Sequence, residues 1–338
     1  YTTFLLKKHN GLQTKIKNNK GKVLEIENTA GLSFLYDLAL TKIQKEYKGP
    51  VLKLADKMES DKKAYMMGFP SGKLNKMILA EVDEVDFAFF AGLIDDNHLH
   101  NKLNGASGSP IFNHKAKVIG VQNLSNNIAV IFIKSQLLKT VLRVKRGTYE
   151  NLENLFINEI TKAVRIAESG DSHAQFVFAY YLQNESKEIY QQEILNLYKK
   201  SAVQGHIWSQ INLGAILHAQ NIDIEEGKKW MLTAMKQKNK ASYLVAQFVL
   251  AMMLASEKKF PESLILLRQL DKRGIKLSRE FSRKIIPPQY FQQTITASEI
   301  EDTLKTVKKK NVKQETTIKR QGSNFKGENT CHLVFKAD

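Results

Sequence analysis

The segment Asn104-Gly-Ala-Ser-Gly-Ser-Pro-Ile111 places a serine, Ser107, on a glycine-rich turn. A serine hydroxyl is a weak nucleophile that needs a base, a carboxylate to orient the base, and two backbone N–H groups aimed at the developing oxyanion. Gly105 would let its own N–H and that of Ser107 converge, and Gly108 would leave room beside Oγ. The pattern predicts nucleophilic catalysis at Ser107 with an oxyanion hole formed by Gly105 and Ser107; the alternative is a simple hairpin turn.

This segment resembles the Gly-x-Ser-Gly-Gly/Ser-Pro motif of the chymotrypsin clan, with the nearest likeness to glutamyl endopeptidases and HtrA peptidases. Residues 107–113 and 118–121 are similar to the strand–turn–strand that follows the nucleophile in glutamyl endopeptidases. Residues 127–133 are similar to the close of an HtrA protease domain. The resemblance implies a trypsin-like serine endopeptidase that acts on a protein or peptide and uses no metal or organic cofactor.

In that clan the three catalytic residues follow the chain order His, Asp, Ser. Tyr36-Asp-Leu-Ala-Leu-Thr-Lys-Ile43 resembles the HtrA signature that carries the catalytic aspartate, so Asp37 is expected to accept a hydrogen bond from the imidazole. Residues 51–55 and 67–72 resemble the stretch between the aspartate and the serine in the same family. The alternative for Asp37 is a surface aspartate at the start of a strand.

His9 is the histidine that precedes Asp37, by 28 residues. The run Phe4-Leu-Leu-Lys-Lys-His9 is similar to the apolar run before the catalytic histidine of the family, although Lys7-Lys8 stand where the family has Thr-Ala or Thr-Asn. His9 is therefore the expected general base, and an exposed histidine near a chain end is the alternative.

The resemblance places Asn101, Lys102 and Gln122 at the substrate pocket, and His98 and His100 in the loop that forms its wall. Gln122 stands where glutamyl endopeptidases carry the histidine that recognises glutamate, so a preference for glutamate is not expected. Lys102 either favours an acidic side chain or points to water.

Two departures from the family pattern bear on activity. Ala106 replaces the aspartate with which trypsins pair a new amino terminus, so that route of activation is not expected. Only eight residues precede His9, where the fold normally has about two strands; the first barrel is then either trimmed or incomplete with an exposed edge. An incomplete barrel would make the protein a catalytically inactive protease fold that acts as a binding adaptor.

The first half of the chain reads as short strands separated by Gly, Asn, Asp or Pro. The predicted strands are 22–27, 38–43, 65–69, 85–90, 118–122 and 128–133, and helical spacing begins at 135–142. Many short strands favour an antiparallel barrel or sandwich. We therefore expect a multidomain β-then-α chain: a chymotrypsin-like antiparallel β-barrel protease domain over residues 1–147, followed by an α-helical solenoid.

The helical half repeats itself every 32–36 residues. Small-residue markers recur at 167–170, 202–205, 234–237 and 270–274, and similar apolar stretches recur at 174–182, 209–217 and 246–254. This period indicates stacked helical hairpins. Ala202, Gly205, Gly214 and Ala215 are small enough to let paired helices approach closely.

Lys199-Lys-Ser-Ala-Val-Gln-Gly-His206 with Gln210-Ile-Asn-Leu-Gly-Ala-Ile-Leu217 resembles the Sel-like repeat, a relative of the tetratricopeptide repeat. Repeats of this kind imply that residues 152–290 bind a protein partner. An ordinary helical bundle is the alternative. Residues 291–338, which follow Pro287-Pro288, are polar and Lys-rich, and are expected to be a largely mobile basic tail with one short helix near 299–308.

The net charge of +17 is spread along the chain, with excesses of +9 over residues 1–150, +5 over 151–290 and +3 over 291–338. A nucleic-acid binder concentrates basic residues on one face or arm, so a nucleic-acid partner is not expected. Cys331 is the single cysteine, which excludes an internal disulfide and a cysteine metal cluster. The sequence contains no apolar run of membrane-spanning length. Relatives of this architecture are mostly bacterial and often exported, so the resemblance is compatible with a secreted, periplasmic or host-delivered location, which the residues themselves do not specify.

Overall fold

The computed structural model describes residues 16–17, 23–24, 26–36, 38–43, 52–56, 63–68, 75–84, 89–94, 108–125, 128–138, 152–186, 189–237 and 239–292. The chain divides into two compact units, residues 1–294 and 295–338, and every described residue lies in the first. The predicted helix near 299–308 and nearly all of the predicted tail lie outside the described residues. The predicted domain boundaries stay predictions.

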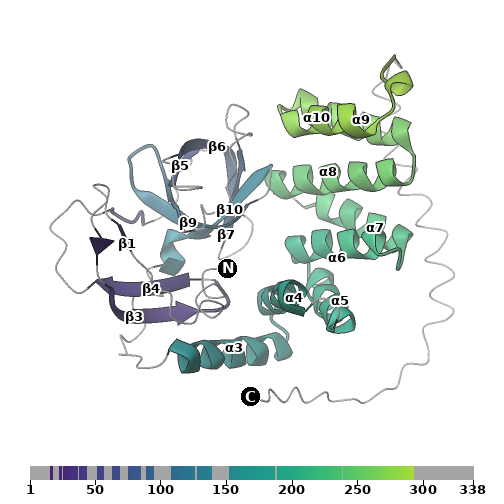
Figure 1. The fold of residues 1–338 in the computed structure, drawn as a ribbon. Helices are drawn as coiled ribbons and strands as arrows, with labels where there is room; N and C mark the ends of the chain where they lie inside the picture. The colour runs from purple at the N-terminus through teal and green to yellow at the C-terminus, as the bar shows by residue number, and fades with distance from the viewer. Residues whose placement is uncertain are drawn as a thin grey trace, which may run out of the picture. The chain divides into compact units, whose positions relative to one another are not determined.

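Six antiparallel strands close into a barrel in the order β10-β7-β6-β5-β8-β9 (Figure 1). They are β5 (Ala64–Gly68), β6 (Asn75–Glu84), β7 (Phe89–Ile94), β8 (Pro110–Phe112), β9 (Val118–Ser125) and β10 (Ala129–Lys134). Alternate residues of β5 point inward, where Met66 packs with Leu79, Ile111 and Phe132. This alternation buries one apolar face of the strand, which is what drives the sheet to close on itself.

Two smaller hairpins precede the barrel. β1 (Ile16–Lys17) pairs with β2 (Val23–Leu24), and β3 (Ile26–Ser33) pairs with β4 (Leu38–Ile43). The turn between β3 and β4 comprises residues 34–36. The chain then runs beside the barrel at residues 52–56, where the Ala55 N–H donates to the Val118 carbonyl oxygen over 2.8 Å.

The strand predictions over 38–43 and 128–133 are confirmed by β4 and β10. The prediction for 85–90 overlaps β7 only at its start, and β6 was missed. β6 contains a bulge between Ala80 and Asp83, with Glu81 at φ 49°. The bulge places Leu79 and Val82 both inside the barrel, so the apolar residues lose the two-residue period that marks a strand.

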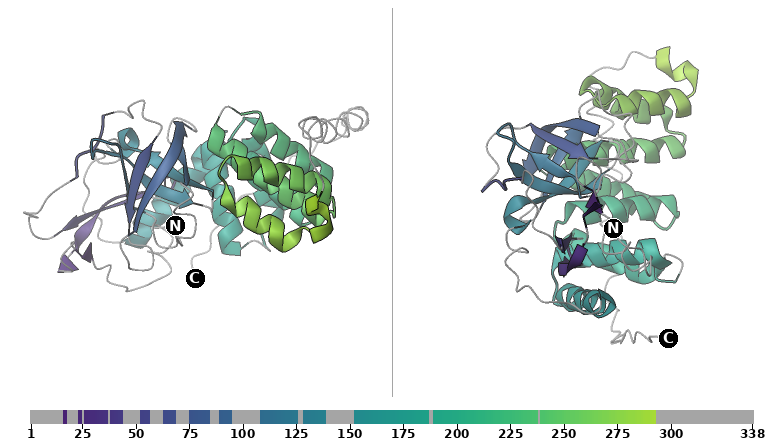
Figure 2. Two further views of the ribbon diagram at one scale, coloured as in Figure 1. Left: turned by 90° about the horizontal axis from the view of Figure 1, so that it is seen from above. Right: turned by 60° about the vertical axis from the view of Figure 1, so that its left-hand side comes forward.

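The helical half of the described chain forms four antiparallel pairs, seen as successive layers in Figure 2. They are α3 (Leu152–Glu168) with α4 (Ser172–Ser186), α5 (Gln191–Val203) with α6 (Ile207–Ala219), α7 (Ile224–Met235) with α8 (Lys240–Ser256), and α9 (Phe260–Lys272) with α10 (Lys276–Ile285). A 3-10 helix, η3 (Pro288–Gln292), follows. None of the helices in the described ranges is long and apolar enough to cross a membrane.

The predicted markers lie where the first helix of each pair ends. Gly170, Gly205 and Gly274 have φ of 102°, 91° and 86°, values that suit glycine at a helix end. The expectation that Gly205 lets helices approach closely is wrong, because a Cβ there would meet nothing within 4 Å. Gly214 does have that role: a Cβ on it would lie 2.7 Å from the Gly227 carbonyl oxygen of the next pair.

The second helix of the first three pairs begins with an equivalent side-chain cap. Asp171 accepts from the Ala174 N–H at 2.7 Å, His206 from the Ser209 N–H at 3.3 Å, and Asn239 from the Ser242 N–H at 2.8 Å; these are α4, α6 and α8. Each cap satisfies a backbone donor that has no partner within the helix.

The start of α8 also contacts the barrel. Asn239 uses its amide nitrogen to donate to the Glu84 carbonyl oxygen at 3.1 Å, and Lys240 forms an ion pair with Glu81. One asparagine side chain thus caps a helix through its oxygen and holds the end of β6 through its nitrogen.

Candidate functional site

Most of the predicted site residues lie outside the described residues: these are His9, Asp37, Asn101, Lys102, Gly105 and Ser107. The loop histidines, His98 and His100, lie there too. The structure describes Gln122 itself, and it describes the residues that adjoin Ser107 and Asp37 in sequence, which are Gly108 and Tyr36.

The turn directly after Ser107 is fixed to β9. Gly108 has φ 85°, a conformation that favours glycine, and its N–H donates to the Gln122 carbonyl oxygen at 2.9 Å. The Gln122 N–H in turn donates to the Ser109 carbonyl oxygen at 2.9 Å. This reciprocal pair of hydrogen bonds holds the chain on the C-terminal side of Ser107 against one position of β9.

The Gln122 side chain is buried within the barrel, with 3% of its surface exposed. Its amide nitrogen donates to the Ser125 hydroxyl oxygen at 3.2 Å. Among the described residues its amide oxygen has no hydrogen-bond partner. Burying an acceptor without a partner costs free energy, because water can no longer solvate it.

The turn before Asp37 is attached to Asn123, which follows Gln122 in β9. The Asn123 side-chain amide donates to the Tyr36 carbonyl oxygen at 3.2 Å. Gln122 and Asn123 therefore hold the sequence neighbours of Ser107 and Asp37, respectively. Sequence reasoning missed Asn123, because an asparagine within a strand has no motif of its own and is recognised only from its partner.

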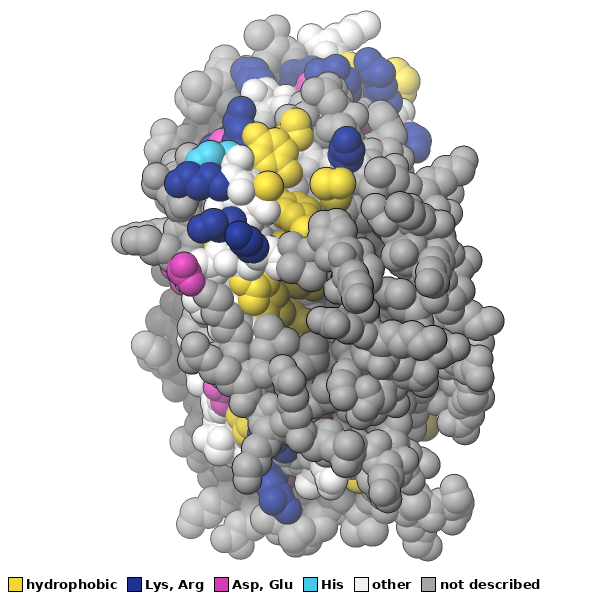
Figure 3. Space-filling model, turned by 90° about the vertical axis from the view of Figure 1, so that its left-hand side faces the viewer, with side chains coloured by type: hydrophobic (Ala, Val, Ile, Leu, Met, Phe, Trp, Pro, Cys, Tyr) yellow, Lys and Arg dark blue, Asp and Glu magenta, His cyan; other side chains and the backbone are white. Residues whose placement is uncertain are grey.

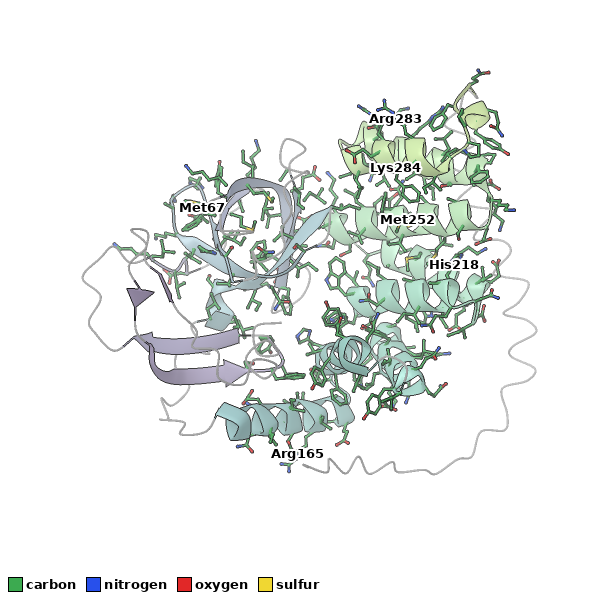
Figure 4. The ribbon with its side chains drawn as sticks, in the orientation of Figure 1. Met67, Arg165, His218, Met252, Arg283 and Lys284 are labelled. Atoms are coloured by element: carbon green, nitrogen blue, oxygen red, sulfur yellow. The ribbon has the colours of Figure 1, made fainter. Side chains whose placement is uncertain are left out.

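A charged cluster in the helical pairs was also not predicted. Lys228 lies between Glu225 and Glu257 at 2.6 and 3.0 Å. His218, labelled in Figure 4, lies 3.2 Å from Glu257. Burial alone would raise the pKa of Glu257, but hydrogen bonds from Lys259 and Lys228 outweigh it and lower that pKa. Because each carboxylate faces a cation, this cluster joins α6, α7 and α8 rather than supplying a reactive group.

His206 and Tyr198 are buried and have shifted pKa values. Burial, with a smaller contribution from His173, lowers the pKa of His206 to about 3. Burial also raises the pKa of Tyr198, whose hydroxyl donates to the Gln183 side chain at 2.7 Å. Both groups stay uncharged at neutral pH, which suits internal packing.

The described ranges contain no group of three His, Cys, Asp or Glu side chains that could hold a metal ion. On the outer face of the barrel, Tyr65 and Met67 of β5 are exposed, and Leu52 is exposed in the segment before β5. Figure 3 shows hydrophobic side chains among Lys and Arg on the face turned to the viewer, and Figure 4 shows Met67 on the outside of the barrel.

Residues 10–121 match the trypsin-like peptidase domain. The matched stretch includes Asp37 and Ser107 and begins one residue after His9. The six-stranded antiparallel barrel followed by helical pairs is consistent with a trypsin-like peptidase domain followed by a helical solenoid.

Among solved structures, the chain is similar to the Rv3671c protease from M. tuberculosis in its active form, with 14% identity and a TM-score of 0.33, covering 40% of this chain and 64% of that one. The inactive form gives 14% identity and a TM-score of 0.32, covering 40% and 72%. A serine-to-alanine variant in the inactive form gives 13% identity and a TM-score of 0.28, covering 36% and 64%. The chain thus spans less than two thirds of two of these three chains. No curated protein matches this chain.

Proposed function

We propose that the chain is a serine endopeptidase that hydrolyses peptide bonds through an acyl-enzyme on Ser107. His9 acts as general base and then general acid, and Asp37 orients the imidazole. The N–H groups of Gly105 and Ser107 form the oxyanion hole.

The observation that supports the proposal most directly is the pair of attachments to β9. Gln122 binds the backbone of Gly108, which follows Ser107, while Asn123 binds the carbonyl of Tyr36, which precedes Asp37. Two segments about 70 residues apart in sequence are thereby tied to adjacent positions of one strand. Asp37 and Ser107 both lie within residues 10–121, the stretch that matches the trypsin-like peptidase domain.

In the proposed reaction, Ser107 Oγ attacks the scissile carbonyl carbon as His9 takes its proton. The C–N bond then breaks, the amine leaves with the proton from His9, and the acyl group stays on Ser107 as an ester. A water molecule, deprotonated by His9, attacks the ester carbon; the bond from that carbon to Ser107 Oγ then breaks, Oγ takes the proton back from His9, and the acid is released. The backbone donors stabilise the oxyanion in both steps, which is commonly the largest contribution to the rate.

Asn101, Lys102 and Gln122 form the proposed substrate pocket. The support for Gln122 is its buried amide oxygen, which has no hydrogen-bond partner among the described residues. An acceptor in that position favours a substrate side chain that can donate a hydrogen bond.

The helical pairs are proposed to be Sel-like repeats that hold a protein partner or the substrate beside the peptidase domain. The support is the recurrence of the pairs with glycine ends at 170, 205 and 274 and with equivalent caps at 171, 206 and 239. Holding a substrate near the site would raise its local concentration.

A fluorophosphonate probe, which reacts with an activated serine, tests the proposal on the full chain. We expect the wild type to be labelled and Ser107→Ala to show only background, a loss of roughly a thousandfold or more in labelling rate. Ser256→Ala, on the exposed end of α8, is the matched control and should label like the wild type. Undiminished labelling of Ser107→Ala would contradict the assignment of the nucleophile.

The second candidate function is a non-enzymatic adaptor built on an inactive protease fold. The observation that favours it is that the match to the peptidase domain begins after His9. A folded full-length wild type that takes no label would support the adaptor and reject the peptidase. Labelling that is lost in His9→Ala would reject the adaptor.

A further inference from the structure

The turn between β3 and β4 contacts the helical pairs through three consecutive residues. Phe34 is 5% exposed and packs against Ala163 of α3, with its ring edge-on to Tyr181 of α4 at 5.1 Å and 80°. Leu35 lies partly buried against the same cluster. The turn is therefore packed against the first helix pair.

The turn also contacts His173, which is the second residue of α4 and is 5% exposed. Its Nε2 lies 3.1 Å from the Leu35 carbonyl oxygen. Since a carbonyl oxygen can only accept, Nε2 carries the proton and donates. The imidazole also stacks on the Tyr36 ring at 5.6 Å and 14°, and it contacts the Phe89 ring of β7 at 5.0 Å. His173 thus touches the turn and the closed barrel together.

The same turn is also held by the barrel. Asn123 of β9 donates to the Tyr36 carbonyl oxygen, while His173 donates to the Leu35 carbonyl oxygen. Two successive carbonyls are therefore fixed by two different parts of the chain. The next residue is Asp37, whose carboxylate orients the base in the proposed function.

We propose that His173 is a positioning residue of the peptidase: by holding the 34–36 turn, the first helix pair keeps Asp37 in its working position. This inference rests on the proposed function. It makes the helical pairs part of the catalytic architecture as well as a binding surface, because displacing α4 would release the turn that leads into the catalytic aspartate.

Two substitutions in the full chain separate the hydrogen bond that His173 donates from the contacts of its ring. His173→Phe keeps an aromatic ring and removes the donor, whereas His173→Gln keeps an N–H at a similar reach and removes the ring. Phe248→Leu is the control for general loss of helical packing, because Phe248 contacts Phe281 within the last two helix pairs. The rate of fluorophosphonate labelling is measured against probe concentration, which separates the maximal rate from the probe affinity.

We expect His173→Phe to lower the maximal labelling rate about tenfold, as for the loss of one buried hydrogen bond, with probe affinity unchanged. His173→Gln should stay within about threefold of the wild type, and Phe248→Leu should label like the wild type. Hydrogen exchange of β3 and β4 should rise about tenfold in His173→Phe alone. An unchanged maximal rate in His173→Phe, or equal losses in the Phe and Gln variants, would overturn the positioning role.

Hydrogen exchange distinguishes failure of this inference from failure of the proposed function. A wild type that takes no label overturns the peptidase itself, and with it the role of Asp37. Exchange of β3 and β4 that is unchanged in His173→Phe overturns the claim that His173 holds the turn, whatever the labelling shows.

Discussion

The closed barrel and the helical pairs differ in how far along the chain their contacts reach. In the barrel, consecutive strands also pair, but the sheet closes through β10 with β7 and β5 with β8, which are distant in sequence. In the helical half, each helix packs chiefly on its sequence neighbours. Stability in such a stack is nearly a sum of local terms, whereas a closed sheet gains or loses its pairings together. A substitution that introduces a comparable steric clash should therefore destabilise the whole barrel, whereas in the helical half it should destabilise only the neighbouring helices.

The largest expected effect comes from adding one methyl group at Gly120 of β9. A Cβ there would lie 2.3 Å from the Ile133 carbonyl oxygen and 2.5 Å from Phe132 Cδ2. Because the obstacle is the backbone of β10, Gly120→Ala should lower the free energy of unfolding by about 3 kcal/mol. Hydrogen exchange with mass spectrometry should show lost protection in all six barrel strands.

Gly214→Ala is the matched control for Gly120→Ala in the helical half. The new Cβ would lie 2.6 Å from the flexible end of Met231 and 2.7 Å from the Gly227 carbonyl oxygen. Alanine also favours a helix over glycine by about 1 kcal/mol, which offsets part of the clash. Lost protection should be confined to α6, α7 and their neighbours, and equally wide loss in both variants would contradict the comparison.

A fall in pH should have a smaller effect per pH unit, and it should arise in the helical half. The pKa of His206 is about 3 in the folded chain, below the usual value near 6.5. The unfolded chain therefore binds the proton first. The contribution of His206 is complete above about pH 6.5 and is lost as the pH falls toward 3, by at most about 1.4 kcal/mol per pH unit. Urea unfolding between pH 7 and 4 measures this slope.

The neighbouring repeat supplies the variant that tests the origin of the slope. His206→Asn copies Asn239, which caps α8 with the same Ser three residues later. This change should flatten the slope, even though removing the ring that packs on Phe176 lowers stability at neutral pH. Asn239→Ala should lower stability by about 1 kcal/mol at every pH and leave the slope unchanged. A slope that persists in His206→Asn would assign it to another group.

How much could be predicted from the sequence also differs between the two regions. The helical pairs were predictable, because Gly170, Gly205 and Gly274 mark the helix ends at a regular period. The barrel was predictable as a class but not in each strand, since the bulge at Glu81 hides the alternation of β6.

For the site, the motifs pointed to Ser107 and Asp37, whose placement stays a prediction. Asn123 and His173, which hydrogen-bond to the turn before Asp37, are isolated polar residues that belong to no sequence motif. Asn123 bonds to Tyr36, which is 87 residues away in sequence, and His173 bonds to Leu35, which is 138 residues away. No local sequence pattern encodes a pairing over such a distance.

The smallest expected effect lies where the two regions meet. Lys240 and Glu81 form an ion pair with 47% and 36% of their side-chain surfaces exposed. A double-mutant cycle with Lys240→Ala and Glu81→Ala should give a coupling free energy of about 0.5 kcal/mol, which falls toward zero in 1 M salt because exposed charges are screened. A coupling above about 2 kcal/mol would show that this contact carries much more of the attachment than its exposure allows.

The contacts that the barrel makes with α4 and α8 set the size of the helical array between them. His173, near the start of α4, reaches the Leu35 carbonyl oxygen of the β3–β4 turn, and Asn239, which caps α8, reaches the Glu84 carbonyl oxygen of β6. One helix pair, α5 with α6, lies between the two attachment points. The spacing of these points therefore fixes how many helix pairs fit between them. Inserting or deleting a unit between residues 189 and 221 would leave one attachment unmatched, whereas units appended after α10 would leave both in register. Lineages that lengthen such an array are therefore expected to do so at its far end.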